Sequence, residues 1–347
     1  MNDSLSHALL EIAEAPPAAG DTREVAPGIL WLRMPLPFAL DHINLWLIAE
    51  QDGYALVDCG YGDAATRALW ERHFATTLAN RPIRRIVVTH CHPDHVGNAA
   101  WLAARFGCTI AMTQSEYFAA HALLAGHAGY GPADVHALFA HHGMPAEHVA
   151  ALADRGNHYR RGVPEAPCAF ARMIDGDALA LGTRRWRVVT GYGHSTEHAS
   201  LASPEARLLI SGDMLLPRIS TNVAVWPGEP DADPVQRFLD SLAAFATLPP
   251  DTLVLPSHGL PFRGIGARVA QLRAHHADRL AELQRFLADA PAPQSAHDVI
   301  PVLFRRALDV HQRFFAIGEA IAHLNHLWRE GRVERRVERD GAIRFAA

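Results

Sequence analysis

The sequence Thr89-His90-Cys91-His92-Pro93-Asp94-His95 places three imidazoles and one carboxylate within six residues, directly after a predicted strand. That strand, residues 83–88, ends in apolar, β-branched side chains that are typical of a buried parallel strand. Such a polar cluster is costly to bury unless a cation binds its lone pairs. Imidazole nitrogen and carboxylate oxygen suit zinc, iron or manganese. In an extended chain His90 and His92 share one side, which leaves Asp94 and His95 free to turn toward a second ion. A solvated loop is the alternative in a chain with 22 histidines.

Four further segments repeat this pattern of an apolar strand followed by a ligand-type side chain. Ligands at the carboxyl ends of buried strands lie on one rim of a sheet, where loops converge on a site. Five such segments in one chain therefore predict a single metal site. The four added side chains are Asp58 after residues 54–57, His194 after 188–190, Asp213 after 208–210 and His258 after 253–257.

In this order of motifs the chain resembles the metallo-β-lactamase superfamily, over about residues 25–265. The resemblance implies an α+β fold, the αββα sandwich, in which two sheets pack face to face with helices outside. It also implies two metal ions, with Asp58 supporting the site by hydrogen bonding. The implied ligands are His90, His92 and His194 for the first ion, Asp94, His95 and His258 for the second, and Asp213 as the bridge.

The residues around Asp213 indicate which branch of the superfamily the chain resembles. The Ser211–Asp213 motif and the segment after it are similar to a branch of uncharacterised bacterial hydrolases that includes relatives of a human mitochondrial endoribonuclease. β-Lactamases of the superfamily generally have Cys at the bridging position, so Asp213 argues against a role in drug resistance. Some lactonases have Tyr three residues after the bridge, where this chain has Leu216. The glutathione-binding residues of glyoxalase II-type relatives are not located in this sequence.

The implied chemistry is hydrolysis by a hydroxide that bridges two ions. Two ions roughly 3.5–4 Å apart lower the pKa of a shared water to near 7, and the hydroxide attacks a small ester, thioester or lactone. Two zinc ions are expected, with iron and manganese left open. Asp94 is the carboxylate expected to orient the water. His198 either orients a ligand or begins a helix without a catalytic role. A ribonuclease and a one-iron sulfur dioxygenase are the alternative enzymes.

The loop of residues 217–223 follows the bridging aspartate directly. Its polar side chains are therefore expected to reach the site, and Arg218 and Asn222 are the candidates for binding substrate. Arg218 suits a carboxylate or a phosphate, which a guanidinium binds with two parallel hydrogen bonds. Pairing of Arg218 with Glu229 or Asp231 is the structural alternative.

Composition indicates a cytoplasmic enzyme with a small-molecule substrate. All 32 basic residues are arginine, which excludes a lysine Schiff base and a lysine-containing phosphate loop. The net charge of −5 argues against a dedicated nucleic-acid binder. The N-terminus lacks the basic and apolar segments of a signal peptide, and no apolar run approaches the ~20 residues that span a bilayer. Four scattered cysteines predict reduced thiols, and Cys91 should point away from its two histidine neighbours.

Four regions are expected along the chain. Residues 1–24 form an arm or short helix, and 25–265 form the sandwich domain. Residues 113–165 are a helical insertion, predicted to be a lid over the site. Residues 266–347 form a winged-helix-like domain with helices at 266–288, 298–308 and 312–330 and a terminal hairpin. A capping box of Ser295 and Asp298 starts the second of these helices. Acidic side chains offset the hairpin arginines, so packing or homodimerisation is favoured over nucleic-acid binding.

Overall fold

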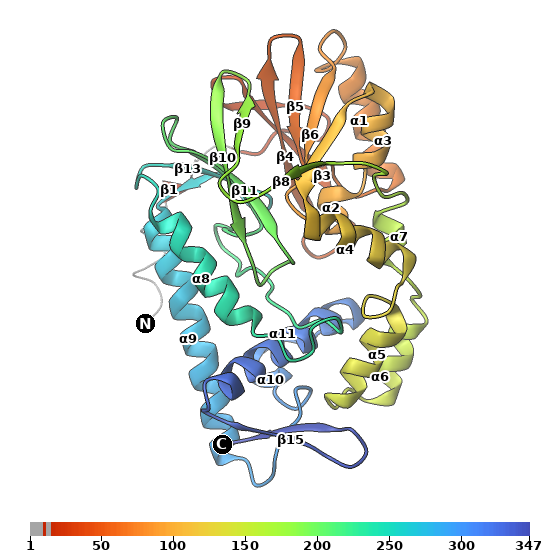
Figure 1. Ribbon diagram of the computed structural model, residues 1–347, viewed down its shortest axis with the longest axis vertical. Coiled ribbons are helices and arrows are strands. Elements are labelled where there is room, and N and C mark those ends of the chain that lie inside the picture. Colours follow the sequence, from red (N-terminus) through yellow and green to blue (C-terminus); the bar gives the residue numbers. More distant parts are fainter. Residues whose placement is uncertain (1–9, 12–14) are drawn as a thin grey trace.

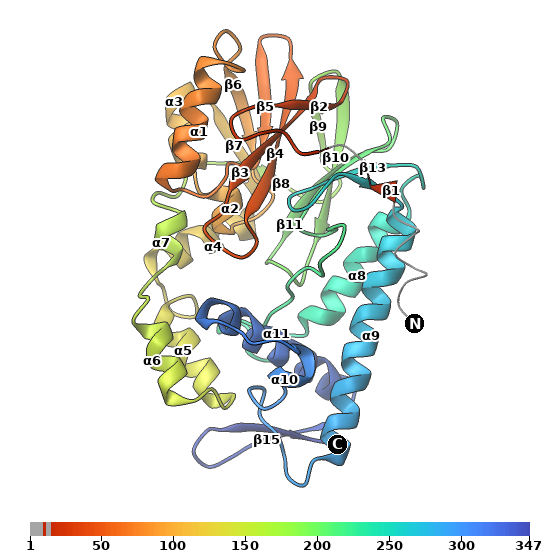
Figure 2. The ribbon, with the colours of Figure 1, turned by 180° about the vertical axis from the view of Figure 1, so that it is seen from behind.

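The computed structural model describes residues 10–11 and 15–347, and it contains two seven-stranded sheets packed face to face with helices outside (Figures 1 and 2). This arrangement confirms the predicted α+β sandwich. The first sheet has the order β2-β3-β4-β5-β6-β7-β8, and the second has the order β1-β14-β13-β12-β11-β10-β9. The strands of the first sheet are β2 (Arg23–Ala26), β3 (Ile29–Pro35), β4 (His42–Glu50), β5 (Gly53–Val57), β6 (Ile83–Val87), β7 (Thr109–Thr113) and β8 (Ala171–Met173). Those of the second are β1 (Leu10–Glu11), β9 (Ala178–Leu181), β10 (Arg184–Gly191), β11 (His198–Ser203), β12 (Leu208–Gly212), β13 (Leu253–Pro256) and β14 (Phe262–Arg263).

Large aromatic side chains fill the space between the two sheets. Trp31 and Trp46 stack with ring centroids 6.0 Å apart, and Trp186 joins them from the second sheet. All three are almost fully buried, so each removes a large apolar area from water. Asn44 ties the sheets together, because it accepts a hydrogen bond from the Trp31 indole and its amide donates to the carbonyl of Pro256. The sandwich therefore holds β4 and β13 in a fixed relation beside the rim that carries the motifs.

Helices α1 (Ala64–Ala75), α2 (Pro93–Val96) and α3 (Ala99–Phe106) cover the outer face of the first sheet or its rim. Asp63 caps α1 by accepting from the backbone N–H of Thr66 at 2.8 Å. Helix α3 follows the loop that carries the candidate ligands, and Gly97 and Asn98 separate it from α2. The short α2 carries Asp94 and His95 and lies at the end of the sandwich that faces the C-terminal helices (Figure 1).

The insertion contains the three helices that its sequence predicts and one short helix more. Its elements are α4 (Gln114–Ala125), α5 (Pro132–His141), α6 (Ala146–Ala153) and α7 (Tyr159–Gly162). Val135, Leu138, Phe139 and Leu152 of this insertion belong to the same apolar cluster as the C-terminal helices. The insertion is thus packed onto the C-terminal region, and its opening as a lid stays a prediction.

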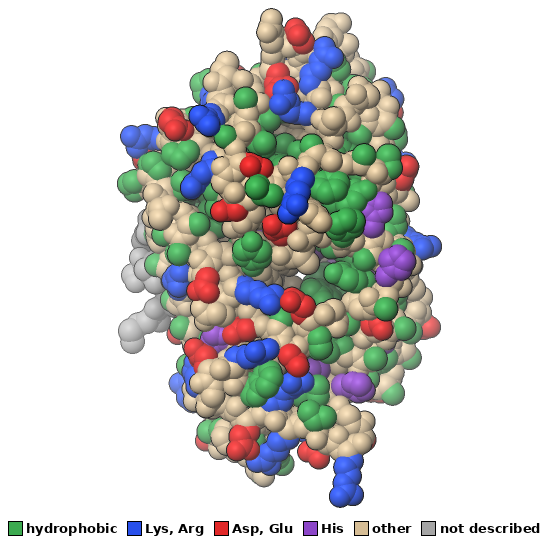
Figure 3. Space-filling model, viewed as in Figure 1, with side chains coloured by type: hydrophobic (Ala, Val, Ile, Leu, Met, Phe, Trp, Pro, Cys, Tyr) green, Lys and Arg blue, Asp and Glu red, His purple; other side chains and the backbone are tan. Residues whose placement is uncertain are grey.

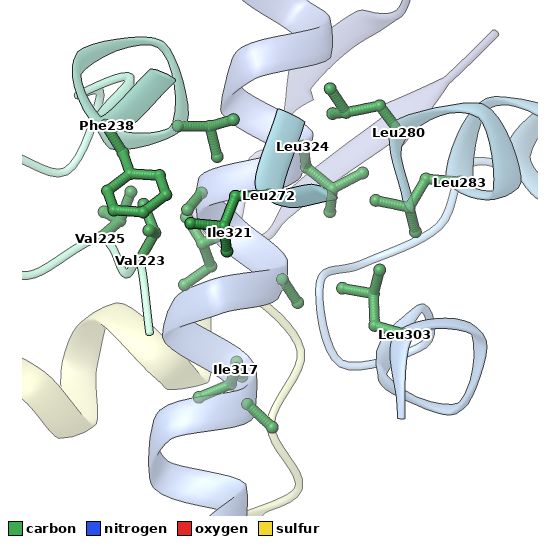
Figure 4. Packing of buried hydrophobic residues seen from close by; sticks show 14 of the residues in the cluster. Val223, Val225, Phe238, Leu272, Leu280, Leu283, Leu303, Ile317, Ile321 and Leu324 are labelled. Carbon is green, nitrogen blue, oxygen red and sulfur yellow. The ribbon is translucent and has the colours of Figure 1, made fainter. Parts of the chain in front are cut away.

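The C-terminal region consists of α8 (Pro234–Ala246), α9 (Ile265–Asp289), α10 (Ile300–Leu303) and α11 (Val310–Arg329), followed by a hairpin. Figure 4 shows Phe238, Leu272 and Ile321 meeting in the apolar cluster between α8, α9 and α11. The prediction of a helix over residues 298–308 is wrong, because within that range only the four residues of α10 are helical. Ser295 and Asp298 do form reciprocal hydrogen bonds, at 2.8 and 3.2 Å, but these stabilise the turn before α10. The winged-helix comparison is not confirmed.

The hairpin of β15 (Glu334–Val337) and β16 (Ile343–Ala346) has the expected form. Several of its arginines make ion pairs within the chain: Arg335 with Asp231 at 2.7 Å and Arg336 with Glu334 at 2.8 Å. These pairs favour the packing role over nucleic-acid binding. Dimerisation stays a prediction.

The N-terminal arm is extended where it is described. Leu10–Glu11 pairs with β14, and β2 begins within the arm at Arg23. The short helix expected in residues 1–24 falls mainly on residues outside the described part of the chain. Among the described helices, none is long and apolar enough to cross a bilayer.

Candidate metal centre

Loops at the ends of four buried strands bring the motif residues together on one rim of the sandwich. His90 and His92 follow β6, and His194, Asp213 and His258 follow β10, β12 and β13. Asp58, directly after β5, has a left-handed backbone with φ of 61°, which turns its carboxylate under the loop of residues 89–95. Tertiary folding therefore assembles side chains that are up to 200 positions apart, counted from Asp58 to His258.

One set of three nitrogens meets at a point. His90 Nε2 lies 2.8 Å from His92 Nδ1 and 3.2 Å from His194 Nε2. His194 Nδ1–H donates to the carbonyl of Asn222 at 2.8 Å, which leaves an unshared pair on Nε2. His90 Nδ1 similarly faces the hydroxyl of Thr89 at 3.0 Å. Two lone pairs thus face each other at close range, an arrangement that a cation stabilises.

A second set lies beside the first and is joined to it by Asp213. The other set consists of Asp94, His95 and His258. Asp213 Oδ1 lies 3.5 Å from His95 Nε2 and 3.4 Å from His258 Nε2, while its Oδ2 lies 3.4 Å from His194 Nε2. The two carboxylate oxygens therefore point to different sets, an arrangement that suits a bridging ligand.

The unsatisfied polar atoms of the rim fit a metal site. Asp213 Oδ1 and His95 Nε2 are buried without a hydrogen-bond partner in the described structure. Burial and the neighbouring imidazoles lower the pKa values of His90 and His92, so both favour the neutral, ligating form. Burial opposes protonation of His95, but the carboxylates of Asp94, Asp58 and Asp213 raise its pKa. Without a metal ion, a protonated imidazole would thus offset the negative charge of these carboxylates.

Asp58 and His198 contact the segments that carry the candidate ligands. Asp58 accepts from the Thr89 backbone N–H and from His95 Nδ1–H, each at 2.8 Å. His198 Nε2 accepts from the backbone N–H of Asp213 at 3.1 Å and holds the segment that carries the bridging carboxylate. Gly212 is needed there, because a Cβ atom would lie 2.3 Å from His198 Nε2. The helix-start alternative for His198 is wrong, because His198 begins β11.

Sequence reasoning missed several residues that support the rim. Glu116 of α4 is buried and joins two motif loops, since its carboxylate accepts from the N–H of Cys91 at 2.9 Å and from the N–H of Glu197 at 2.6 Å. His42 accepts from His258 Nδ1–H through its backbone carbonyl at 2.8 Å. A buried glutamate on an alanine-rich helix has no motif, so only tertiary contacts reveal Glu116. Cys91 itself is buried beside Ala119 and Ala120, as its alternation with the histidines predicts.

The two residues expected to bind substrate have different settings. Arg218 is exposed on the loop after β12. Its proposed acidic partners have other ion pairs, Glu229 with Arg237 and Asp231 with Arg335, each at 2.7 Å. Asn222 is partly buried, and its amide donates to Glu319 of α11 at 2.8 Å. Binding of substrate by either residue stays a prediction.

Glu319 is a carboxyl group that the C-terminal region brings toward the rim. Burial raises its pKa to about 7, although the hydrogen bond from Asn222 and the charge of Arg279 oppose this shift. It lies on the helix that crosses the open end of the sandwich (Figures 1 and 2). Sequence reasoning does not find this position, because Glu319 is 97 residues from Asn222 in the chain.

Aromatic rings lead from the rim to the same helix. Phe38, on the loop before β4, contacts Tyr61 with ring centroids 5.5 Å apart and stacks on His311 of α11 at 4.6 Å. His311 in turn contacts Phe315 at 5.0 Å. Burial raises the pKa of Tyr61, and the carboxylates of Asp63 and Asp94 add to this shift. Figure 3 shows a hollow near the middle of this face, between the sandwich and α11 of Figure 1, with apolar side chains gathered beside it.

Comparison with known proteins agrees with this geometry. Residues 39–258 match the model of the metallo-beta-lactamase superfamily, and residues 280–347 match that of the metallo-beta-lactamase-like C-terminal domain. The chain is similar to the crystal structure of a beta-lactamase domain protein from Burkholderia ambifaria, with 48% identity, a TM-score of 0.92 and 99% of each chain covered. It is 24% identical to a probable metallo-hydrolase, YqjP, of Bacillus subtilis over 86% of this chain and 92% of that protein. It is also 27% identical to a hydroxyacylglutathione hydrolase of Rhodobacter capsulatus, over 65% of this chain and 64% of that protein. The chain therefore belongs to the metallo-beta-lactamase superfamily of hydrolases.

Proposed function

We propose that this protein is a dinuclear metal hydrolase that cleaves a small ester, thioester or lactone. The observation that carries the proposal is the pair of three-residue sets on one rim, with the two oxygens of Asp213 directed to different sets. Asp213 Oδ1 and His95 Nε2 have no partner in the described structure, and they are the atoms that metal ions would engage.

The ligand types favour two zinc ions. His90, His92 and His194 would hold one ion, Asp94, His95 and His258 the other, and Asp213 both. When bound, a pair of divalent ions lowers the pKa of a water and polarises the oxygen of the substrate carbonyl. Iron and manganese accept the same nitrogen and oxygen donors.

Asp94 is the residue proposed to orient the attacking water and hold its proton. Its side chain is 18% exposed, against 10% for Asp213 and 3% for Asp58, so it is the most accessible of the three carboxylates. The other two are committed by geometry, Asp58 to Thr89 and His95, and Asp213 to the bridging position. Asp94 thus keeps one face available to a reactant.

The surroundings of the rim support a small substrate with an apolar acyl group. Phe38, His311 and Phe315 form a strip of partly buried rings between the loop before β4 and α11, and the buried Tyr61 packs against Phe38. Arginines of the terminal hairpin, which a polyanion would need, pair with Asp231 and Glu334. The relative from Rhodobacter capsulatus is named for an acylated thiol compound, which agrees with a thioester among the candidates.

Metal analysis followed by a substrate panel tests the proposal. Protein purified without a metal-binding tag should contain two zinc or manganese ions per chain and hydrolyse members of a panel of acyl esters, acyl thioesters and lactones. Chelation should remove the activity and zinc should restore it. One iron per chain with oxygen consumption, or cleavage of single-stranded RNA alone, would overturn the proposal.

A further inference from the structure

The loop of residues 217–223 connects the candidate metal centre to the C-terminal helix α11. The backbone carbonyl of Asn222 accepts from His194 Nδ1–H at 2.8 Å, and the side-chain amide of the same residue donates to Glu319 Oε2 at 2.8 Å. One residue therefore makes two hydrogen bonds, one to a candidate ligand and one to a carboxyl group of another region. The direction of the first bond fixes which nitrogen of His194 carries its proton.

The chain directly after this loop is also held to α11 through its backbone. The N–H of Val225 donates to the carbonyl of Gly318 at 3.1 Å. Glycine at position 318 permits this approach, since a Cβ atom would lie 3.0 Å from the Cβ of Ala224. Two successive helix residues, Gly318 and Glu319, thus contact the segment that carries Asn222.

The helix that presents Glu319 is itself firmly placed. His323, one turn later, donates from Nδ1 to the carbonyl of Glu319 at 2.8 Å, and its Nε2 lies 3.1 Å from His276 Nδ1 of α9. Ile317 and Ile321 on either side are fully buried in the apolar cluster of Figure 4. Because packing fixes the helix at Glu319, little conformational entropy is lost when its carboxyl group accepts the hydrogen bond from Asn222.

We propose that Glu319 is a positioning residue for the metal ligand His194, and that it acts through Asn222. The C-terminal region then contributes directly to the centre, by holding the acceptor that orients one imidazole. The raised pKa of Glu319 agrees with this role, because a neutral carboxyl group still accepts from an amide N–H. This inference rests on the proposed function, since it requires that His194 binds a metal ion.

Metal affinity in four proteins tests the inference: the wild type, Glu319→Ala, Glu319→Gln and Asn222→Ala. Binding of cobalt is followed by its visible absorption, and binding of zinc by competition with a chromophoric chelator. Loss of an orienting partner weakens metal binding by about 10- to 100-fold in such sites. We expect Glu319→Ala and Asn222→Ala each to weaken one of the two binding steps by about 10-fold and to change the cobalt spectrum. Glu319→Gln retains an acceptor oxygen and should restore both.

The design separates the possible failures. A wild type that binds no metal would remove the proposed function itself. A wild type that binds two ions, with variants that match its affinities within twofold, would overturn the role of Glu319 alone. Asn222→Ala keeps the backbone carbonyl and removes only the tether, so it tests the same bond should Glu319→Ala fail to fold. The double variant Glu319→Ala/Asn222→Ala should bind metal no more weakly than either single variant, because both substitutions remove the same hydrogen bond. An additive loss of metal affinity in the double variant would contradict the inference that Glu319 acts through Asn222.

Discussion

The rim of the sandwich and the helical layer below it both bury histidines, but they use them in opposite ways. On the rim, His95, His194 and His258 each donate from Nδ1 to a carboxylate or carbonyl, and their Nε2 atoms converge. In the helical layer, His142 is fully buried and stacks on Phe345, with both ring nitrogens unpaired in the described structure. Burial lowers the pKa of His142 to about 3, with help from the charge of Arg335.

The difference shows that burial alone does not identify a ligand. A ligand needs a partner that fixes its tautomer and a neighbour whose lone pair faces the same point. Two histidines of the insertion meet only the first condition: His121 contacts the carbonyl of Pro167 at 2.8 Å and His148 contacts Arg313, but among the described residues neither belongs to a group that could hold an ion. The predictions below test this contrast.

Removing the bridging carboxylate should have the largest effect. Asp213→Ala takes away the one group directed to both sets, so metal retention and turnover should be lost together. A loss of about 10³-fold in kcat/KM, or about 4 kcal/mol, is the expected scale. Metal content and hydrolysis are measured side by side, with Asp52→Ala in the exposed turn after β4 as the control. Turnover that persists in Asp213→Ala would contradict the two-metal mechanism.

Removing the charge of Asp58, which lies under the loop of residues 89–95, should have a smaller effect. Asparagine tolerates the left-handed backbone of Asp58, so Asp58→Asn changes the charge with little strain. The new amide would face His95 Nδ1–H, where an acceptor is needed, and metal affinity should fall by about 10- to 100-fold. Asp63→Asn is the matched control, because asparagine caps a helix as well as aspartate does. Equal zinc affinities for Asp58→Asn and the control would show that Asp58 is not an orienting group.

Shortening the aromatic strip should affect substrate selection and leave the metal unchanged. Phe315→Ala should reduce kcat/KM by about 10-fold for long-chain or aryl acyl substrates and little for acetyl substrates, because the lost contacts are apolar. Phe106→Ala, which removes the contact between Phe106 of α3 and Phe74 of α1, serves as the control. A uniform loss over all acyl lengths would indicate a structural effect instead.

The last prediction concerns stability, and its size depends on pH. His142 has a folded pKa of about 3, below its ordinary value of 6.5, so the unfolded chain binds the proton more readily. The contribution of neutral His142 to the free energy of unfolding is fully present above pH 6.5. Below that pH the free energy of unfolding falls by about 1.4 kcal/mol per pH unit. His142→Met should therefore flatten the decline in unfolding free energy between neutral and mildly acidic pH. Urea unfolding at several pH values measures this, with the exposed His127→Met as control; parallel curves for His142→Met and wild type would refute it.

The sandwich and the gathering of the motif residues on one rim were predictable because their signals are local. An apolar β-branched segment predicts a strand, and a ligand directly after it predicts a place on the rim, as for His90 and Asp213. The four-residue α10 was not predictable, because periodic spacing cannot show where packing ends a helix. Glu116 was missed for a related reason: its two partners, Cys91 and Glu197, come from separate loops.

The sequence by itself determined which side chains reach the rim, because the strand pattern and the motif spacing are properties of neighbouring residues. The tertiary structure alone decided which atoms meet there: the tautomers of His194 and His258, the two directions of the Asp213 carboxylate, and the approach of Glu319 to Asn222. These depend on contacts between residues up to a few hundred positions apart. Such contacts arise only when burial of the shared apolar core fixes the sheets and the C-terminal helices against one another.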